Sequence, residues 1–356
     1  MKPVWVLLGL WCFISQGFAA PHFVNAQPPL QGSIDFKPAA LCATAQQTLD
    51  YLNKGVAYDP QVIHAGKMVP ISVARIKATL SFICQHQNQL NNPAFIRQHF
   101  TFIRWYPDLK RAKQLAAHKP LLQNIPADRI LMTKYFVPMV KASLKATPAM
   151  PYALYGLPPD EQHLTMEEAN AQSQLIRFKY GKQAILKGAL NQLAVPKLAY
   201  LSRDDLETAL MQGTVIADFG PPVGKKTFNV HRVNNIAYDR TKNPYQQERF
   251  WYFKQVDGIK GYGKDADHKI TVNPEVTFAA DLTQFGLGKM LLIQYRDKSG
   301  EMINRAGIFA DTGGAFADNL YQVDYLAGSY YGKAAYLKAT QALPDYVAAY
   351  FMVLKN

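Results

Sequence analysis

Six short segments of strand-forming residues occupy the second half of the chain, and this pattern limits the possible folds more than any other feature. They are separated by Gly, Pro, Asn or Asp, and in chain order they read TVIADFG, KTFNVHRV, RFWYFKQV, KITVNPEVTFAA, KMLLIQYRD and AGIFAD. β-Branched and aromatic residues between such turn residues are typical of β-strands. A last segment of this kind, AAYFMVLK, lies near the C-terminus. The sequence therefore predicts that residues 214–356 are mostly short strands.

The first third of the chain is helical in pattern. Apolar residues at helical spacing predict one helix over about 42–55 and a second over about 73–90. Residues 95–119 mix aromatic and basic residues and predict two further helices. Proline-punctuated segments over 134–161 predict strands and turns. Helices followed by many short strands indicate an α+β protein with one or two β-barrels.

The N-terminus has the layout of a secretory signal peptide. Lys2 is followed by an apolar run from Val4 to Ile14, and Gly17-Phe18-Ala19 supplies the small residues of a cleavage site. The run is shorter than the roughly 20 apolar residues that a membrane-spanning helix needs. Trp11 precedes Cys12 where a lipid-anchor signal has small residues. We expect residues 1–19 to be removed, giving a soluble protein of the periplasm or the medium without a stable membrane anchor.

Removal of the signal leaves two cysteines, Cys42 and Cys84. An exported chain with two cysteines can form one disulfide. If the two predicted helices pack antiparallel, the start of the first lies beside the end of the second, where Cys84 falls. We therefore predict a Cys42–Cys84 disulfide; the alternative is two buried free thiols.

Composition and missing motifs narrow the possible functions. With 49% hydrophobic and 18% charged residues, the chain is a packed globular protein, and a net charge of +13 favours an anionic partner. No nucleic-acid-binding motif accompanies the charge, so we do not expect the protein to bind nucleic acid. The sequence has no HExxH, Walker, GxGxxG or GxSxG motif. We expect no cofactor and no metal, and carboxylates remain the candidates for chemistry.

The stretch FADTGGAFADNLYQVDYLAG, residues 309–328, interleaves three aspartates with aromatic residues. Asp311 opens a Thr-Gly-Gly turn, and the simplest interpretation of such a turn is an Asp that bonds the following amides. Asp324 lies among apolar residues, which should raise its pKa and favour the protonated carboxyl that a general acid needs. Asp318 is a possible rival for that role.

The spacing of these aspartates resembles a known family. An Ala-x-Asp followed seven residues later by Gly is matched by Asp281 and Gly288, a D-x-G-G-A turn by Asp311 to Ala315, and a D-x-x-x-G segment by Asp324 to Gly328. These are the three aspartate motifs of the "3D" domain of the membrane-bound lytic murein transglycosylase A family. Upstream, Thr133-Lys-Tyr-Phe-Val-Pro138 resembles the family's T-G-Y-Y-x-P segment. The resemblance extends from about residue 131 to the end of the chain.

The resemblance implies an α+β fold in which a double-psi β-barrel has a second, smaller β-domain inserted into it. Residues 20–140 and 258–356 would form the helical segment and the barrel. Residues 141–257 would form the inserted domain, with an extra helix over about 166–193 that begins at a capping box. A groove between the two domains would hold a peptidoglycan glycan strand.

The resemblance also implies an activity. The family cleaves the MurNAc–GlcNAc bond without water and leaves 1,6-anhydro-MurNAc ends, with one carboxyl as acid and then base. By position Asp324 would be that group, Asp311 its anionic neighbour, and Asp281 either a third catalytic residue or an anchor of the barrel turn. Candidate substrate-binding residues are Thr133, Lys134, Tyr135, Trp251, Gly313, Gly314 and Tyr325. Tyr262 could stack on a sugar face, and Arg232 could meet a substrate carboxylate.

The chain departs from the family pattern at several positions. Asp311 and Asp324 are thirteen residues apart, two more than is usual, and Lys134 and Phe136 replace a glycine and a tyrosine. The family's Gly-Ser-Gly motif is missing. Two alternatives therefore stay open: a non-catalytic peptidoglycan-binding protein on the same barrel, and a glycan hydrolase that uses water. In each case we expect a monomer.

Overall fold

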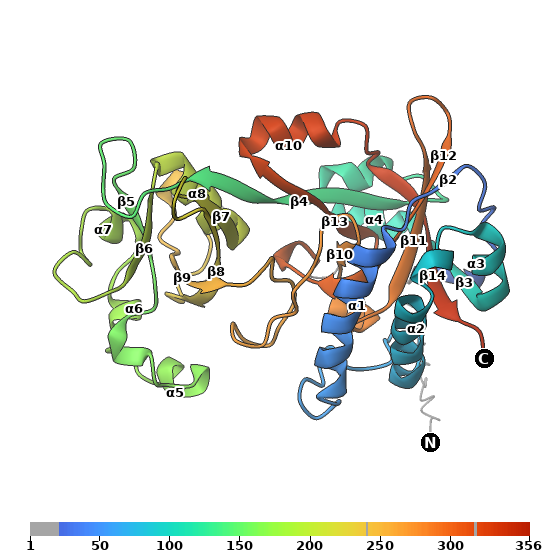
Figure 1. The fold of residues 1–356 in the computed structure, drawn as a ribbon, viewed down its shortest axis with the longest axis horizontal. Coiled ribbons are helices and arrows are strands. Elements are labelled where there is room, and N and C mark those ends of the chain that lie inside the picture. Colours follow the sequence, from blue (N-terminus) through green and yellow to red (C-terminus); the bar gives the residue numbers. More distant parts are fainter. Residues whose placement is uncertain (1–20, 240, 317–318) are drawn as a thin grey trace, which may run out of the picture.

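The computed structural model describes residues 21–239, 241–316 and 319–356. The predicted signal peptide and Asp318 lie outside these residues. Two lobes lie side by side, and two long strands run from one toward the other (Figure 1). These strands are β4, Ile130–Lys141, and β13, Gln322–Tyr331, and they pair in parallel.

A twelve-stranded sheet spans both lobes. Its order is β1-β3-β14-β11-β12-β10-β13-β4-β7-β8-β9, and β2 pairs with β12. The remaining strands of this sheet are β1 His22–Asn25, β2 Ser33–Ile34, β3 Phe100–Tyr106, β7 Thr214–Asp218, β8 Lys225–Val233, β9 Trp251–Val256, β10 Thr277–Ala279, β11 Met290–Arg296, β12 Met302–Asp311 and β14 Tyr346–Leu354.

Six strands of the first lobe form a closed ring of pairings. The order β14-β11-β12-β10-β13-β4 returns to its start because β14 also pairs with β4, through Tyr346–Leu131 and Val347–Ile130. Both faces of several of these strands are buried; all of Met290–Tyr295 is inaccessible or nearly so. Continuous apolar runs of this kind are expected where a strand is covered on both sides.

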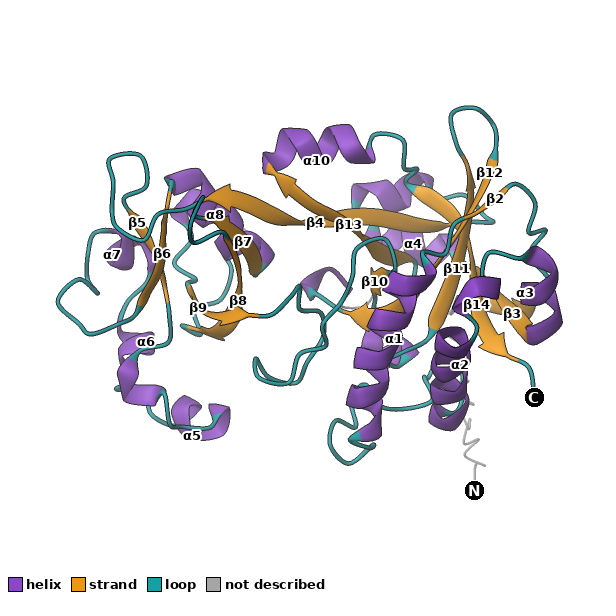
Figure 2. Cartoon of the chain, viewed as in Figure 1, coloured by secondary structure: helices purple, strands orange, loops and turns teal. Residues whose placement is uncertain are grey.

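Helices cover the first lobe (Figure 2). They are α1 Pro38–Asn53, α2 Val73–Gln85, α3 Pro93–His99, α4 Leu109–Leu115, α9 Leu282–Phe285 and α10 Gly332–Thr340. The sequence pattern predicted α1 and α2 well. They pack on each other, and a disulfide joins Cys42 to Cys84 with the Cα atoms 4.8 Å apart. This is the pairing that antiparallel packing of the two helices predicts.

The second lobe has its own core. Strands β5 Tyr152–Tyr155 and β6 Lys197–Leu201 form a small sheet, and α8 Arg203–Gln212 packs beside β7. Buried apolar side chains form one cluster from residues 140–253 and another from residues 30–137 and 270–353. The division of the chain into domains at 141 and 257 stays a prediction, with which these clusters agree.

The prediction of two helices over residues 95–119 is wrong in its middle. Residues 100–106, FTFIRWY, form β3, which pairs with β1 on one side and β14 on the other. Phe100, Phe102 and Arg104 are buried, and the residues between them are partly exposed. This alternation and the aromatic content are strand features that outweigh the basic residues around them.

The single helix predicted over 166–193 is also wrong. The capping box forms, with the Thr165 amide donating to Glu168 Oε2 at 2.8 Å. The chain then breaks into α5 Met166–Asn170, α6 Ile176–Lys179 and α7 Lys182–Leu186. Arg177 and Lys182 are buried, and their charged groups bond to Glu161 and Glu207. A continuous helix with both side chains exposed would lose these contacts.

One lysine of the first lobe is buried without an acidic partner among the residues that the structure describes. Lys289 is 2% exposed, and its Nζ donates to the Val69 carbonyl. Burial lowers its pKa to about 7. Because the pKa in the folded state is depressed, the unfolded chain binds more protons between pH 7 and 10.5, and the free energy of unfolding rises with pH across that window.

We expect Lys289→Met to stabilise the protein, with most effect at or below pH 7. The stabilisation should shrink by about 2–3 kcal/mol between pH 7 and pH 9, as the wild-type lysine loses its proton. Urea unfolding of both proteins over this range measures the difference. Lys298→Met, which changes an exposed lysine, is the matched control. A difference that does not change with pH would contradict the assignment of a buried titrating amine.

Candidate active site

A groove of about 520 Å³ lies between the two lobes. Its first wall comes from the ring of strands and includes Tyr135, Asp311 and Asp324. Its second wall comes from the other lobe and includes Asn229 and Trp251. The loop between β9 and β10 lies between the lobes (Figure 2) and contributes Tyr262 and Lys269 to the lining.

Strand pairing brings Asp311 and Asp324 together. Ala279 of β10 is opposite Asp311 in the parallel pair with β12 and opposite Asp324 in the antiparallel pair with β13. Residues opposite one another across neighbouring strands point to the same face of the sheet. The two carboxylates therefore flank the small Ala279 side chain at one place in the groove.

Asp324 is held in an environment that favours its protonated form. Burial raises its pKa to about 7, and the neighbouring Asp311 charge adds to the rise. A hydrogen bond with Thr133, which is opposite Asp324 on β4, counteracts part of it, and Lys134 and Lys119 act in the same direction. The Asp324 Oδ1 atom is buried and has no hydrogen-bond partner among the described residues. A buried carboxyl oxygen left free beside a groove is suited to exchange a proton with a ligand.

Asp311 differs because its carboxylate has partners. The Tyr135 hydroxyl donates to Oδ2 at 2.7 Å, and the Thr312 amide donates to Oδ1 at 2.8 Å. Burial raises the pKa of Asp311 to about 6, while these hydrogen bonds and the charge of Lys269 counteract the rise. At neutral pH the pair therefore favours a charged Asp311 beside a protonated Asp324.

Tyr135→Phe is expected to raise the pKa of Asp311. A hydrogen bond to a charged group is worth about 1.5–3 kcal/mol, which corresponds to a pKa change of about 1–2 units. The change is measured by ¹³C NMR titration of the aspartate carboxyl carbons. Tyr262→Phe is the control, since Tyr262 lines the same groove but its hydroxyl donates to Asp59 at 2.8 Å. An unchanged Asp311 titration in Tyr135→Phe would refute the assigned hydrogen bond.

The other candidate residues of the site lie in different surroundings. Thr133 does not line the groove; it is opposite Asp324 on β4, and its Oγ1 accepts from Gln322 at 2.6 Å. Gly313 and Gly314 line the groove in an open turn, with no heavy atom closer than 3.9 Å to a side chain built on either. Trp251 lies in the opposite wall, where the Arg249 guanidinium stacks 4.5 Å from its ring centre.

Four further candidates are not brought to the groove. Asp281 caps α9 by accepting from Thr283, its amide at 3.0 Å and its hydroxyl at 2.6 Å, which favours the structural role for this aspartate. Tyr325 is 1% exposed and bonds Arg305 in the core. Lys134 pairs with Asp345 at 2.5 Å, and Arg232 is buried against Glu161. Tyr325 directly follows Asp324, and Lys134 directly precedes Tyr135. Because side chains alternate along a strand, both point to the face opposite the site.

Sequence reasoning missed Asn229, Met211 and Lys269, which line the groove. Lys269 Nζ donates to Asn229 Oδ1 at 2.6 Å, although forty residues separate them along the chain. Neither residue belongs to a motif. For Lys269 the sequence offered one indirect signal of a place near the site, since its segment precedes the first aspartate motif. Only the pairing of the two lobes brings these side chains together.

The comparisons with known proteins rest on structure. No family model and no curated protein sequence matches the chain. A membrane-bound lytic murein transglycosylase from Agrobacterium tumefaciens is 16% identical and has a TM-score of 0.59, over 90% of this chain and 93% of the other. MltA from E. coli with bound chitohexaose is 16% identical with a TM-score of 0.59, over 94% and 95%. MltA from Neisseria gonorrhoeae is 15% identical with a TM-score of 0.55, over 93% and 94%.

These matches define the class of fold. The chain has a mixed helix-and-sheet architecture that extends over nearly the whole length of the matched structures. Its structural neighbours are MltA lytic transglycosylases from several species, so the chain has the MltA fold that the aspartate spacing predicted. Within the part of the chain that the structure describes, no helix has the length and apolar character needed to cross a membrane.

Proposed function

We propose that the protein is a peptidoglycan lytic transglycosylase. The observation that carries the proposal is the Asp324 carboxyl, which lies at a groove between two lobes with a pKa raised to about 7 and one oxygen unpartnered among the described residues. A carboxyl that is protonated near neutral pH in the ligand cleft is what acid catalysis of glycosidic cleavage requires. The MltA fold makes this reaction class the natural one to test.

The groove is suited to a glycan strand. The E. coli structure of this fold contains chitohexaose, an oligosaccharide of N-acetylglucosamine. Peptidoglycan has the same sugar in every disaccharide and carries peptide carboxylates, which match the net charge of +13 of this chain. Tyr135, Tyr262 and Trp251 present aromatic side chains to the groove, where they would contact sugar faces.

In the proposed reaction, protonated Asp324 donates its proton to the oxygen that links MurNAc C1 to GlcNAc, and the C1–O bond breaks. The Asp324 carboxylate then accepts the proton of the MurNAc C6 hydroxyl, whose oxygen forms a bond to C1. The products are a GlcNAc hydroxyl end and a 1,6-anhydro-MurNAc end; no water is consumed and Asp324 regains its proton. Charged Asp311 would keep Asp324 protonated at the start and favour the positive charge that develops at C1.

The same proposal extends to the architecture and location. The ring of six paired strands would be the double-psi β-barrel, and residues 141–257 would be the domain inserted into it. Residues 1–19 would direct the chain out of the cytoplasm, to the periplasm or the medium, where it would act as a monomer on peptidoglycan.

Mass spectrometry of sacculi digested with the mature protein tests the function. Anhydro-MurNAc ends would support both the substrate and the mechanism. Reducing MurNAc ends would overturn the mechanism in favour of hydrolysis by water. Binding to sacculi without any soluble product would overturn the enzymatic proposal in favour of a wall-binding protein.

A further inference from the structure

Lys269 connects the two walls of the groove. It lies on the loop between β9 and β10, a segment whose buried residues Ile270 and Val272 belong to the core of the first lobe. Its Nζ donates to Asn229 Oδ1 at 2.6 Å and to the Val230 carbonyl at 3.4 Å, both on β8 of the second lobe. The side chain therefore extends from one lobe to the other within the groove lining.

Asn229 is fixed so that its carbonyl oxygen faces Lys269. It is 4% exposed, and its Nδ2 donates to the Gly213 carbonyl at 3.1 Å and to Thr214 Oγ1 at 2.7 Å. With both amide hydrogens used in the second lobe, the Oδ1 atom is left to accept from the ammonium group. The Asn229 side chain therefore has one defined orientation, in which its Oδ1 accepts from Lys269.

The loop that carries Lys269 is docked directly beside Asp311. The Tyr262 amide donates to the carbonyl of Ala310 at 2.9 Å, and the Gly261 and Ile270 backbones bond to hold the two arms of the loop together. The Tyr262 hydroxyl is fixed by Asp59, which is 6% exposed. Lys269 precedes Ile270, whose amide donates to the Tyr262 carbonyl, and the Tyr262 amide in turn donates to Ala310. These bonds hold the Lys269 backbone near the end of β12, where Asp311 begins the turn.

We propose that Lys269 is a positioning residue for the reaction: its ammonium group, fixed across the groove by Asn229, holds Asp311 in the carboxylate form. The catalytic consequence rests on the proposed function, whereas the effect on Asp311 does not. A charged Asp311 keeps the proton on Asp324, so Lys269 acts on the acid through its neighbour.

The surrounding charges agree with this role. Lys269 is the cation whose field lowers the pKa of Asp311, and the Tyr135 hydroxyl and the Thr312 amide act in the same direction through hydrogen bonds. The Asp324 carboxyl is the titratable neighbour of Asp311 across Ala279. The charge of Asp311 also raises the pKa of Asp324. The charged groups near Lys269 itself are Asp311, Asp265 and Lys254. Burial lowers the pKa of Lys269, and Asp311 counteracts this, so each group of the pair supports the charge of the other.

The test is a ¹³C NMR titration of the Asp311 and Asp324 carboxyl carbons in wild type, Lys269→Gln, Lys269→Met and Lys269→Arg. Loss of the opposite charge should raise the first apparent pKa of the pair. Lys269→Gln removes the charge and keeps an N–H donor on a side chain that is one bond shorter. Lys269→Arg keeps the charge and should restore the wild-type titration. Lys264→Met, on the same loop but outside the groove lining, should not change it.

The titration and the activity assay separate the two proposals. In the glycan-cleavage assay, the acidic limb of the pH profile should move to higher pH in Lys269→Gln, together with the carboxyl titration, and should return to the wild-type position in Lys269→Arg. Folded Lys269→Gln and Lys269→Met proteins with a wild-type carboxyl titration would overturn the role of Lys269, whatever the activity. If the titration shifts in Lys269→Gln but the wild-type protein cleaves no glycan, the role of Lys269 is supported and only the proposed function is overturned.

Discussion

Asp324→Asn is expected to abolish glycan-strand cleavage, with a loss of at least about 10³-fold in kcat. Asparagine has nearly the shape of the carboxyl but neither donates an acidic proton nor takes one back, so both halves of the proposed reaction fail. The groove and its aromatic side chains remain, and binding to sacculi should therefore be retained. The release of anhydro-MurNAc ends, measured by mass spectrometry across pH 5–8, reports the loss.

Stability gives the Asp324→Asn variant a second readout. The pKa of Asp324 is raised in the folded protein to about 7, so the folded state binds more protons than the unfolded chain between pH 4 and 7. The wild type therefore loses stability as pH rises through this window, and the neutral amide does not. Relative to wild type, Asp324→Asn should gain about 2–4 kcal/mol at pH 8 and little below pH 4.

Asp50→Asn is the matched control, because it changes an exposed aspartate on α1 and should alter neither activity nor stability. Wild-type cleavage by Asp324→Asn would remove this residue from the catalytic role. Loss of cleavage together with loss of sacculus binding and of stability would mean that the substitution disrupts the groove and that the acid is not identified.

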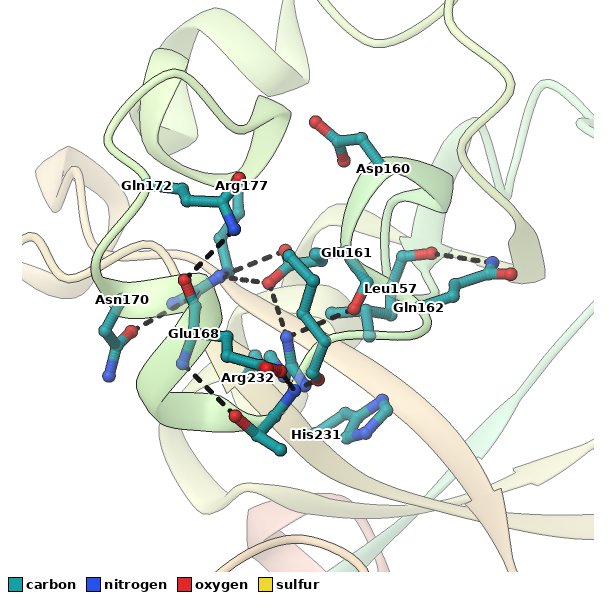
Figure 3. Close-up of polar contacts among 12 residues, drawn as sticks. Leu157, Asp160, Glu161, Gln162, Glu168, Asn170, Gln172, Arg177, His231 and Arg232 are labelled. Carbon is teal, nitrogen blue, oxygen red and sulfur yellow. Dashed lines mark hydrogen bonds and ion pairs between the residues drawn. The ribbon is translucent and has the colours of Figure 1, made fainter.

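The second large effect is expected in the second lobe, where two arginines share one buried glutamate (Figure 3). Arg177 Nε lies 2.9 Å and Arg232 Nη1 2.8 Å from Glu161 Oε2, and the Glu161 and Arg177 side chains are inaccessible to solvent. Arg177 also donates to the Val233 carbonyl at 2.6 Å and to Asn170 at 3.0 Å. The cluster thereby joins α5 and α6 to the end of β8.

Glu161→Gln is expected to destabilise the second lobe by about 3–5 kcal/mol, because it leaves two buried guanidinium groups without a counter-charge. Urea unfolding monitored by two probes measures the change, and a separate early transition would mean that the second lobe unfolds before the first. Glu167→Gln, at an exposed position on α5, is the control and should stay within about 0.5 kcal/mol of wild type.

A triple replacement separates charge from packing. Glu161→Leu combined with Arg177→Met and Arg232→Met removes all three charges while it keeps most of the buried volume. It should recover much of the stability that Glu161→Gln loses, because an apolar set of similar size does not require a counter-ion. If the triple variant is as unstable as Glu161→Gln, the hydrogen bonds of the arginines to the backbone, and not the unbalanced charge, hold the cluster together.

Some predictions depended only on residues near one another in the chain, and these agree with the structure. The spacing of apolar residues predicted α1 and α2, and Thr165 and Glu168 form the predicted capping box. Helical periodicity and capping are short-range effects, so a window of a few residues contains their cause. The aspartate spacing likewise led to the correct fold: two of the motifs lie at or just after the end of a strand, at Asp281 and Asp311, and the third lies within β13.

Other predictions failed where distant segments decide the outcome. Residues 100–106 are a strand because β1 and β14 flank them, and the segment 166–193 is broken because Arg177 and Lys182 find partners elsewhere in the second lobe. The basic residues of both segments suggested exposed helices. Charge by itself does not show whether a side chain is exposed or paired in the interior.

By itself, the sequence determined the class of fold, the cysteines able to pair and the aspartates worth testing. The tertiary structure decided which of those aspartates meet. Asp281, Asp311 and Asp324 each match an aspartate motif in the sequence, yet Asp281 caps a short helix while β10 brings the other two into one groove. It also decided that Lys269 lies across from Asn229. The reason is physical: burial, and with it the pKa of a carboxyl or an amine, depends on which strands and loops surround the group, and those come from far along the chain.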